Sequence, residues 1–192
     1  KLGKLEQAVN SFLKALDLKP DSPETHNNLG LALRDLGKPK DAVASYRKAL
    51  SLKPEYAEAH YNLGNALRNL GKPKEAISSY RKALSYKPDY PEAHSNLGNT
   101  LRELGNLEEA VSSFQAAVAL RPAYPEAHNN MGVTLQDLGK LDEAIASYRA
   151  ALNFRPDYTE AHNNLSGALQ DQGNINEAAT HIDLALSHKP GK

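Results

Sequence analysis

The sequence contains no cysteine among its 192 residues. Disulfide bonds, zinc sites built on thiolates and thiol-based catalysis are therefore excluded. Basic and acidic side chains both number 23, so the formal net charge is zero, which argues against a dedicated nucleic-acid-binding protein. No apolar run reaches the roughly 18 residues of a membrane-spanning helix, so we expect no membrane insertion. No signal-peptide pattern opens the chain, and the expected location is the cytoplasm.

Motifs for catalysis and cofactor binding are missing as well. No glycine-rich phosphate loop, nucleophile–base pair or clustered pair of carboxylates stands out in the sequence. We therefore expect no enzyme activity, no cofactor and no metal in this chain. Because Lys1 falls in the middle of a repeated pattern, we expect the chain to be a piece of a longer protein, and a catalytic domain can lie in another part of that protein.

What the sequence does contain is a repeat of 34 residues. Prolines, glycines and alanines each recur at this spacing, six times and without an insertion. The three series are Pro20, Pro54, Pro88, Pro122, Pro156 and Pro190; Gly3, Gly37, Gly71, Gly105, Gly139 and Gly173; and Ala8, Ala42, Ala76, Ala110, Ala144 and Ala178. Such self-similarity indicates stacked structural repeats.

Five full units follow when position 1 is placed at Pro23. The segments are 1–22, 23–56, 57–90, 91–124, 125–158 and 159–192. We expect residues 1–22 to be the second half of a truncated unit and 159–192 to be a degenerate last unit, in which Ser166 replaces a recurrent glycine. A single unit cannot bury its apolar faces alone, so the units must stack into one continuous solenoid.

Each unit reads as two helices, here called helix A and helix B. Apolar residues recur at helical spacing before and after the central glycine, which stands where a left-handed residue ends a helix. Proline near the end of the unit stops helix B. Ser22 and Pro23 read as the N-cap and first residue of a helix A. Position 24 supplies a large side chain that packs among small ones: Phe12, Tyr46, Tyr80, Phe114, Tyr148 and Ile182.

This pattern resembles the tetratricopeptide repeat over the whole chain. Residues 61–90, "YNLGNALRNLGKPKEAISSYRKALSYKPDY", show it clearly. The "AHxNLG" start with a Pro-x-Tyr end is most similar to the superhelical repeats of O-linked N-acetylglucosamine transferase and plant Spindly proteins. The resemblance implies an all-α, right-handed superhelical solenoid in which helices A line a concave groove.

Position 6 of every helix A is an asparagine: Asn28, Asn62, Asn96, Asn130 and Asn164. It lies about 100° around the helix from the apolar position 7, at the edge of the core-facing stripe. An amide offers a donor and an acceptor, which match one peptide unit. The resemblance implies that this ladder holds polypeptide in the groove. The alternative is structural, with each amide tied to a neighbouring helix.

Other positions are expected to tune the selectivity of the groove. Position 9 carries Asn65 and Asn99, position 12 carries Arg34, Arg68 and Arg102, and position 5 carries Asn27, Tyr61, Ser95, Asn129 and Asn163. The arginines can attract acidic peptides, or they can pair with nearby carboxylates on a solvated face.

Position 4 is histidine in each full unit. Since this histidine occurs once per layer, a structural role is favoured over a metal site. A tyrosine precedes each of the four later helices A and reads as a hydrophobic contact at the start of that helix: Tyr56, Tyr90, Tyr124 and Tyr158.

Two functions are compatible with these features. The first is a scaffold that binds extended peptide or protein segments in an asparagine-lined groove, as the recognition part of a larger protein such as an O-GlcNAc transferase-like protein. The alternative is head-to-tail self-association. Residues 1–90 hold 16 basic and 10 acidic side chains, whereas residues 91–192 hold 7 and 13. Opposite charges and uncapped ends favour a heterologous contact between copies.

Overall fold

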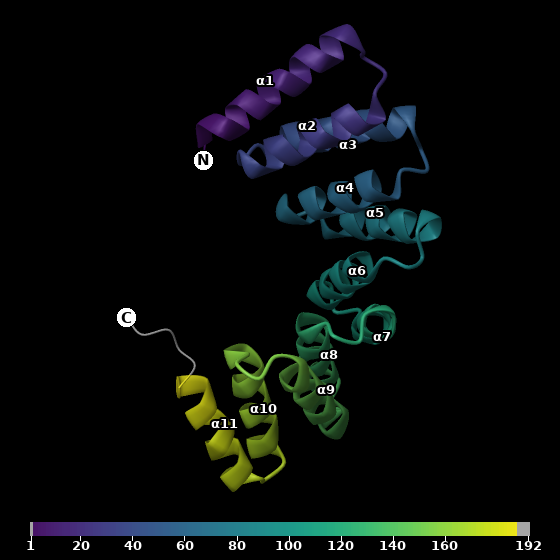
Figure 1. The fold of residues 1–192 in the computed structure, drawn as a ribbon. Helices are drawn as coiled ribbons and strands as arrows, with labels where there is room; N and C mark the ends of the chain where they lie inside the picture. The colour runs from purple at the N-terminus through teal and green to yellow at the C-terminus, as the bar shows by residue number, and fades with distance from the viewer. Residues whose placement is uncertain (1, 188–192) are drawn as a thin grey trace. The chain divides into compact units, whose positions relative to one another are not determined.

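The computed structural model describes residues 2–187, and every regular element in that range is an α-helix (Figure 1). The helices are α1 (Leu2–Leu18), α2 (Pro23–Asp35), α3 (Pro39–Leu52), α4 (Ala57–Asn69), α5 (Pro73–Tyr86), α6 (Pro91–Glu103), α7 (Leu107–Leu120), α8 (Pro125–Asp137), α9 (Leu141–Phe154), α10 (Thr159–Asp171) and α11 (Ile175–Ser187). The predicted all-α fold of helix–turn–helix repeats is confirmed. Pro190, the last marker of the repeat, lies outside the described residues.

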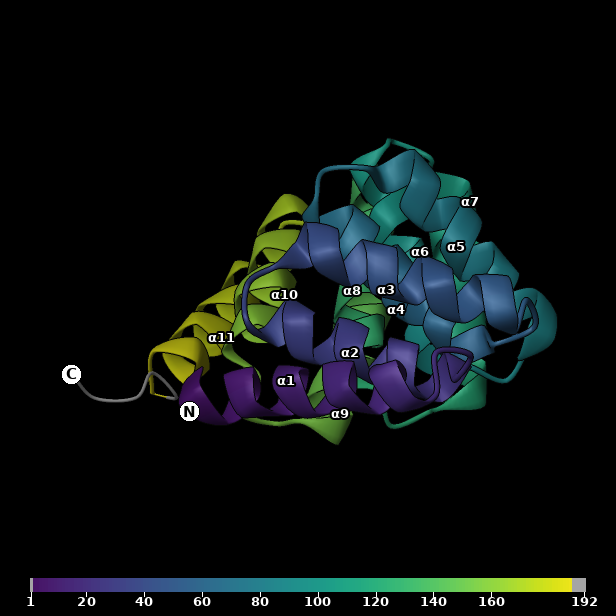
Figure 2. The same ribbon diagram turned by 90° about the horizontal axis from the view of Figure 1, so that it is seen from above.

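The chain forms two compact units, here called unit 1, which ends at Thr100, and unit 2, which begins at Leu101. The boundary falls inside α6. In unit 1, α2 packs on α3, α3 on α4, and α4 on α5 (Figures 1 and 2). In unit 2 the same order runs from α7 to α11. The helices B α3 and α9 are therefore each sandwiched between two successive helices A, and successive helices A, such as α2 and α4, also touch.

Glycine ends each helix A, as the sequence predicts. Gly37, Gly71, Gly105, Gly139 and Gly173 have φ values of 73°, 71°, 79°, 74° and 86°. In the first of these turns, Gly37 N donates to Arg34 O and Lys38 N donates to Leu33 O, both at 2.9 Å. This pair of bonds is the Schellman motif, which satisfies carbonyls that the helix end would otherwise leave unpaired. Gly3 differs from the others, because it lies inside α1 and its φ is not positive.

The starts of the helices use less side-chain capping than the sequence suggests. Ser22 caps α2 as expected, since its hydroxyl accepts from Thr25 N at 3.3 Å. Lys38 and Lys72 precede α3 and α5 without a side-chain cap, and Pro39 and Pro73 occupy the first turn. Proline suits that position because its missing N–H would have had no partner inside the helix.

A glycine and a tyrosine set the distance between helices A and B within a repeat. The rings of Tyr46, Tyr80 and Tyr148 are fully buried. A Cβ atom added at Gly64 would lie 2.6 Å from a carbon of the Tyr80 ring, which is far inside van der Waals contact. Gly30 and Gly132 face Tyr46 and Tyr148 in the same way. The absence of a side chain at position 8 is therefore what lets the ring lie flat against helix A.

The last repeat replaces both members of this contact. Ser166 occupies the glycine position and Ile182 the tyrosine position. The Ser166 hydroxyl donates to Ala178 O at 2.9 Å, so the hydroxyl fills space that a larger ring would need. Ile182 is 38% exposed, whereas Tyr148 is fully buried. In the degenerate last unit, a hydrogen bond from Ser166 to the backbone of α11 thus takes the place of the glycine–tyrosine contact.

Apolar side chains are exposed on the first and last helices. On α1, Leu2 and Leu18 are 64% and 89% exposed, and on α11, Ile175 and Leu186 are 60% and 57% exposed. Both helices are covered on one side only. Between residues 2 and 187, no helix has the length and apolar character needed to cross a membrane.

We predict that Gly64→Ala lowers the free energy of unfolding by about 1–3 kcal/mol, because the new methyl group overpacks against Tyr80. Gly167→Ala is the matched control. Gly167 lies in α10 with no atom within 4 Å of an added Cβ, so alanine should stabilise by up to about 1 kcal/mol through helix propensity. Urea unfolding followed by circular dichroism measures both. Equal effects of the two substitutions would contradict the packing argument.

Candidate functional site

The position-6 asparagines differ in how far they are exposed. Asn28 on α2 is exposed, Asn62 on α4 is only 4% exposed, and Asn96, Asn130 and Asn164 on α6, α8 and α10 are half-buried. Asn28 stands out because the only described helix before α2 is α1, which is a helix B by its phase in the repeat. Burial of a position-6 amide therefore comes from the preceding helix A, and α2 has none among residues 2–187.

The amide N–H groups connect one repeat to the previous one. In unit 1, Asn62 Nδ2 donates to Asn27 Oδ1 at 3.0 Å, and this bond is buried. In unit 2, Asn164 Nδ2 donates to Asn129 Oδ1 at 2.9 Å. Position 6 of one helix A thus bonds to position 5 of the preceding helix A. We call this contact the amide clasp; it is the structural alternative that the sequence left open.

Position 5 lies in the core between helices A, so the expectation that it tunes selectivity is wrong for Asn27 and Asn129. Both are completely buried. In unit 2, Asn129 Nδ2 donates to Glu160 Oε1 at 3.2 Å, which completes the clasp. In unit 1, Asn27 Nδ2 is buried without a partner. Glu58 occupies the position on α4 that Glu160 occupies on α10, so a carboxylate is present on the facing helix.

Between α4 and α6 the clasp takes a different form, because Tyr61 stands at position 5. Asn96 Nδ2 donates to Asn65 Oδ1 at 2.8 Å and lies 3.2 Å from the Tyr61 hydroxyl. The Tyr80 hydroxyl also donates to Asn65 Oδ1, at 2.7 Å. Asn65 is therefore committed to this network. The sequence singled out Asn65 as a groove position, but it could not predict these hydrogen bonds, since position 9 varies from repeat to repeat.

The side chain at position 9 affects the hydrogen bonding of the tyrosine hydroxyl at position 24. Tyr148 donates to Gln136 Oε1 at 3.0 Å. In the first full repeat, Leu31 stands where Asn65 stands in the second, and the Tyr46 hydroxyl is buried without a partner. Burial raises the pKa of Tyr46 to about 12. The side chain at position 9 or 12 therefore decides whether this hydroxyl is satisfied.

The arginines at position 12 are half-buried. Arg34 pairs with Asp35, with Nη2 and Nε at 2.8 and 3.0 Å from Oδ1. For Arg34 the structure therefore shows the carboxylate pairing that the sequence allowed. Arg68 and Asn99, also singled out from the sequence, each have an interaction partner as well. Arg102 belongs to unit 2, whereas Arg34 and Arg68 belong to unit 1.

The histidines at position 4 each hold a proline carbonyl at the start of helix A. The Nε2 atoms of His26, His60, His94, His128 and His162 lie 2.8–2.9 Å from the carbonyl oxygens of Pro20, Pro54, Pro88, Pro122 and Pro156. A carbonyl only accepts, so Nε2 must carry the proton. No group of three or more metal-ligating side chains occurs within residues 2–187.

The tyrosines before helices A make a contact that sequence reasoning missed. Each ring lies under a cation three residues earlier, at 4.6–5.0 Å from its centroid: Lys53–Tyr56, Lys87–Tyr90, Arg121–Tyr124 and Arg155–Tyr158. Such cation–π contacts stabilise the loop by about 0.5–1 kcal/mol at exposed sites. A basic residue at position 31 in four units was the available signal.

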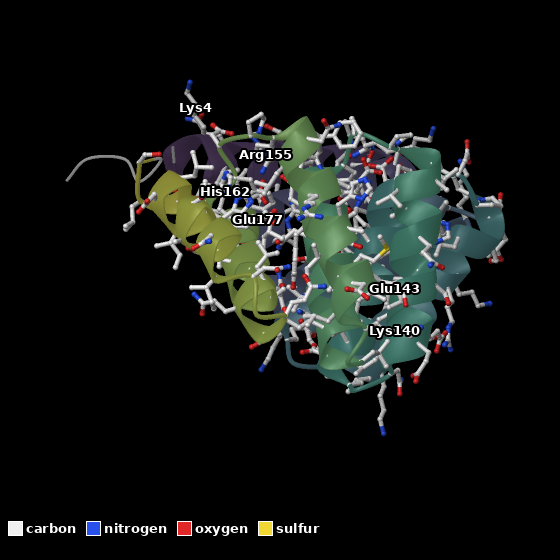
Figure 3. The ribbon with its side chains drawn as sticks, turned by 90° about the horizontal axis from the view of Figure 1, so that it is seen from below. Lys4, Lys140, Glu143, Arg155, His162 and Glu177 are labelled. Atoms are coloured by element: carbon white, nitrogen blue, oxygen red, sulfur yellow. The ribbon has the colours of Figure 1, made fainter. Side chains whose placement is uncertain are left out.

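The last repeat contains a histidine pair instead of the usual serine. Position 23 is Ser45, Ser79, Ser113 and Ser147 in the other full units, and His181 in the last. His162 Nδ1 lies 2.9 Å from His181 Nδ1. Because His162 Nε2 donates to Pro156, His162 Nδ1 must accept and His181 Nδ1 must donate. Figure 3 labels His162 on α10 and Glu177, which precedes His181 by one turn on α11.

Comparisons with known proteins agree on the repeat. A family model described as "TPR repeat" matches residues 1–37, 30–71 and 135–173, and models described as "Tetratricopeptide repeat" match 61–125 and 101–153. No curated protein sequence matches the chain.

Solved structures match as well. The structure of YrrB, described as a TPR protein with an unusual peptide-binding site, is 27% identical, with 95% of this chain and 94% of that one covered and a TM-score of 0.80. MamA from Desulfovibrio magneticus RS-1 is 22% identical, with 86% and 94% covered and a TM-score of 0.81. PilF from Pseudomonas aeruginosa is 22% identical, with 98% and 80% covered and a TM-score of 0.77.

We predict that acid loosens the last repeat. Burial, and then the neighbouring His162, lower the pKa of His181 from 6.5, with Arg149 on α9 adding to the shift and Glu177 opposing it. The unfolded repeat therefore binds a proton more readily, and stability is lost as the pH falls below about 6.5. Hydrogen exchange of α11 should accelerate between about pH 7.5 and 5 after correction for intrinsic exchange rates.

His181→Ser is the control for this prediction, since serine is the residue of the other repeats. It should remove most of the acid-induced change in α11. An unchanged response in the variant would assign the effect to another group.

Proposed function

The chain belongs to the tetratricopeptide repeat family, whose repeats are generally non-catalytic interaction modules, and we propose that it binds extended peptide segments along the asparagine-bearing faces of its helices A. In the helix order of unit 1 this face includes Asn28, Asn62 and Asn96. The scaffold function follows from the family. The segment that is bound and the residues that hold it are the proposal.

The recurrence of the position-6 amide on successive helices A carries the proposal. Asn28 on α2 is exposed and shows this amide without a preceding helix A beside it. A free amide at this point presents both a donor and an acceptor, which match the C=O and N–H of one peptide unit. In Asn62 and Asn96 the N–H group holds the clasp, and these bonds do not use the amide oxygen. Clasping orients these amides before a ligand arrives, which lowers the entropy lost on binding.

The spacing of the helices suits an extended ligand. Packed helices lie roughly 10 Å apart, and an extended chain advances about 3.3 Å per residue. One amide per repeat therefore meets about every third residue of a bound strand. The likeness to YrrB, which is described as having an unusual peptide-binding site, supports a peptide as the ligand. We further propose that the chain serves as the recognition part of a larger, O-GlcNAc transferase-like protein.

The test is Asn28→Ala, measured on peptides selected from a random twelve-residue phage library against the whole chain. We expect binding of the selected peptides to weaken about two- to ten-fold, the loss of one or two net hydrogen bonds. Fluorescence anisotropy with labelled peptides gives the Kd. Stability should be unchanged, because Asn28 makes no contact between repeats.

Two further variants serve as controls for Asn28→Ala. Asn10→Ala removes an exposed amide from α1 and should leave binding unchanged. Asn62→Ala removes the clasp and should lower the free energy of unfolding by about 1–3 kcal/mol, since the Asn27 carbonyl is left buried and unpaired. If Asn28→Ala and Asn10→Ala bind the selected peptides equally well, the asparagines are structural and the proposal fails.

Head-to-tail self-association is the second candidate, and the exposed apolar side chains of α1 and α11 favour it. The first half of the sequence is basic and the second half acidic, so unlike ends attract. We expect sedimentation velocity at low salt to show concentration-dependent oligomers that dissociate above about 0.5 M salt, where charges are screened beyond a few ångströms. A monomer at millimolar concentration and low salt would exclude this function.

A further inference from the structure

A pocket lies in unit 1, between the first two full repeats. It has a volume of about 300 Å³ and is lined by Lys40, Val43 and Arg47 on α3, by Leu67 and Leu70 at the end of α4, and by Lys72 before α5. Val43 and Leu67 are buried and form an apolar floor. The three cations are exposed at its rim. The pocket therefore combines an apolar interior with a positive edge.

The charges at the rim are only partly neutralised. Glu75 Oε2 lies 3.3 Å from Arg47 Nη2, and Glu75 Oε1 lies 3.0 Å from Lys72 Nζ. All three side chains are about half exposed, and ion pairs of this kind contribute about 0–1 kcal/mol. Lys40 has no carboxylate partner among the described residues. One carboxylate thus serves two cations, and a third cation is unpaired.

The equivalent place in unit 2 shows that the fold does not need these cations. Asp142, Gln172 and Asn174 stand where Lys40, Leu70 and Lys72 stand in unit 1. Gln172 donates to Asp142, and Asn174 donates to Gln172 at 2.7 Å, so this place is bridged by polar side chains. The ion pair of Arg47 with Glu75 has a counterpart in Arg149 with Glu177, at 2.6 Å. That pair recurs in both units, and Lys140, 3.8 Å from Glu143, stands in unit 2 at the repeat position of Lys72. Lys40 is specific to unit 1, since its counterparts at the starts of α7 and α9 are Glu108 and Asp142.

We propose that this pocket binds a short acidic segment of a partner protein, in which one apolar side chain is flanked by carboxylates. The apolar side chain enters between Val43, Leu67 and Leu70. The flanking carboxylates pair with Lys40 and Lys72 at the rim. Charge complementarity selects this occupant, since a basic or neutral segment would leave Lys40 unpaired. The site is separate from the asparagine face and does not depend on the function proposed for it.

The test introduces side chains that already stand at the corresponding positions of unit 2. The variant Lys40→Asp with Lys72→Asn takes the side chains of unit 2 and changes the net charge by three units. A control variant, Lys48→Glu with Lys82→Ala, changes the charge equally at exposed sites outside the pocket. The probe is a fluorescein-labelled peptide with one leucine between two pairs of glutamates in a glycine–serine frame. Anisotropy is measured at about 0.15 M salt, where the Debye length is about 8 Å.

We expect the pocket variant to weaken binding at least about ten-fold and the control to change it less than about two-fold. A probe with glycine in place of leucine should bind more weakly to the unaltered chain. Equal losses in the two variants, equal binding of the leucine and glycine probes, or no binding of the leucine probe by about 1 mM would each overturn the proposal. Asn28→Ala should leave this binding unchanged, which separates the two sites.

Discussion

Contact between a glycine and an aromatic ring sets the geometry on which the remaining features depend. Gly64 faces the buried ring of Tyr80, and a Cβ at that glycine would lie 2.6 Å from it. Protein interiors are packed so closely that such a contact admits little variation. Because the same contact recurs at Gly30 and Gly132, helices A and B sit at the same separation in these repeats. This constant separation brings positions 5 and 6 of successive helices A within hydrogen-bonding distance of each other.

The sequence was sufficient to predict the helices, their turns and the stacking. Its markers act within one repeat: a glycine with positive φ at Gly71, or a proline after the end of a helix B, works through local backbone sterics. The amide clasp was harder to predict, because it joins residues on different repeats. Periodicity placed Asn62 at the edge of the core-facing stripe, but it could not show that Asn27 of the preceding repeat would cover it. The resemblance favoured the ligand interpretation, and the clasp gives the same pattern a structural reason.

Differences between repeats carry information that the shared pattern hides. Ser166 and Ile182 change together, since a serine at the glycine position leaves no room for a flat tyrosine ring. His181 replaces a serine that elsewhere bonds to its own helix, and it meets His162 across the repeat instead. At position 9, the difference between Leu31 and Asn65 decides whether a buried tyrosine hydroxyl has a partner. Each is a departure from the repeat, and each has a contact that explains it.

This distinction also decides which surface residues indicate function. A side chain that recurs because the fold needs it says little about a ligand, and the clasped asparagines belong largely to that group. Lys40 has acidic counterparts in unit 2, Glu108 and Asp142, where the same packing is kept. Neither Lys40 nor the exposed Asn28 forms an ion pair or a side-chain hydrogen bond among residues 2–187. Exposed polar groups that the fold does not need are available to bind a ligand, so the two proposed binding surfaces are built on such groups.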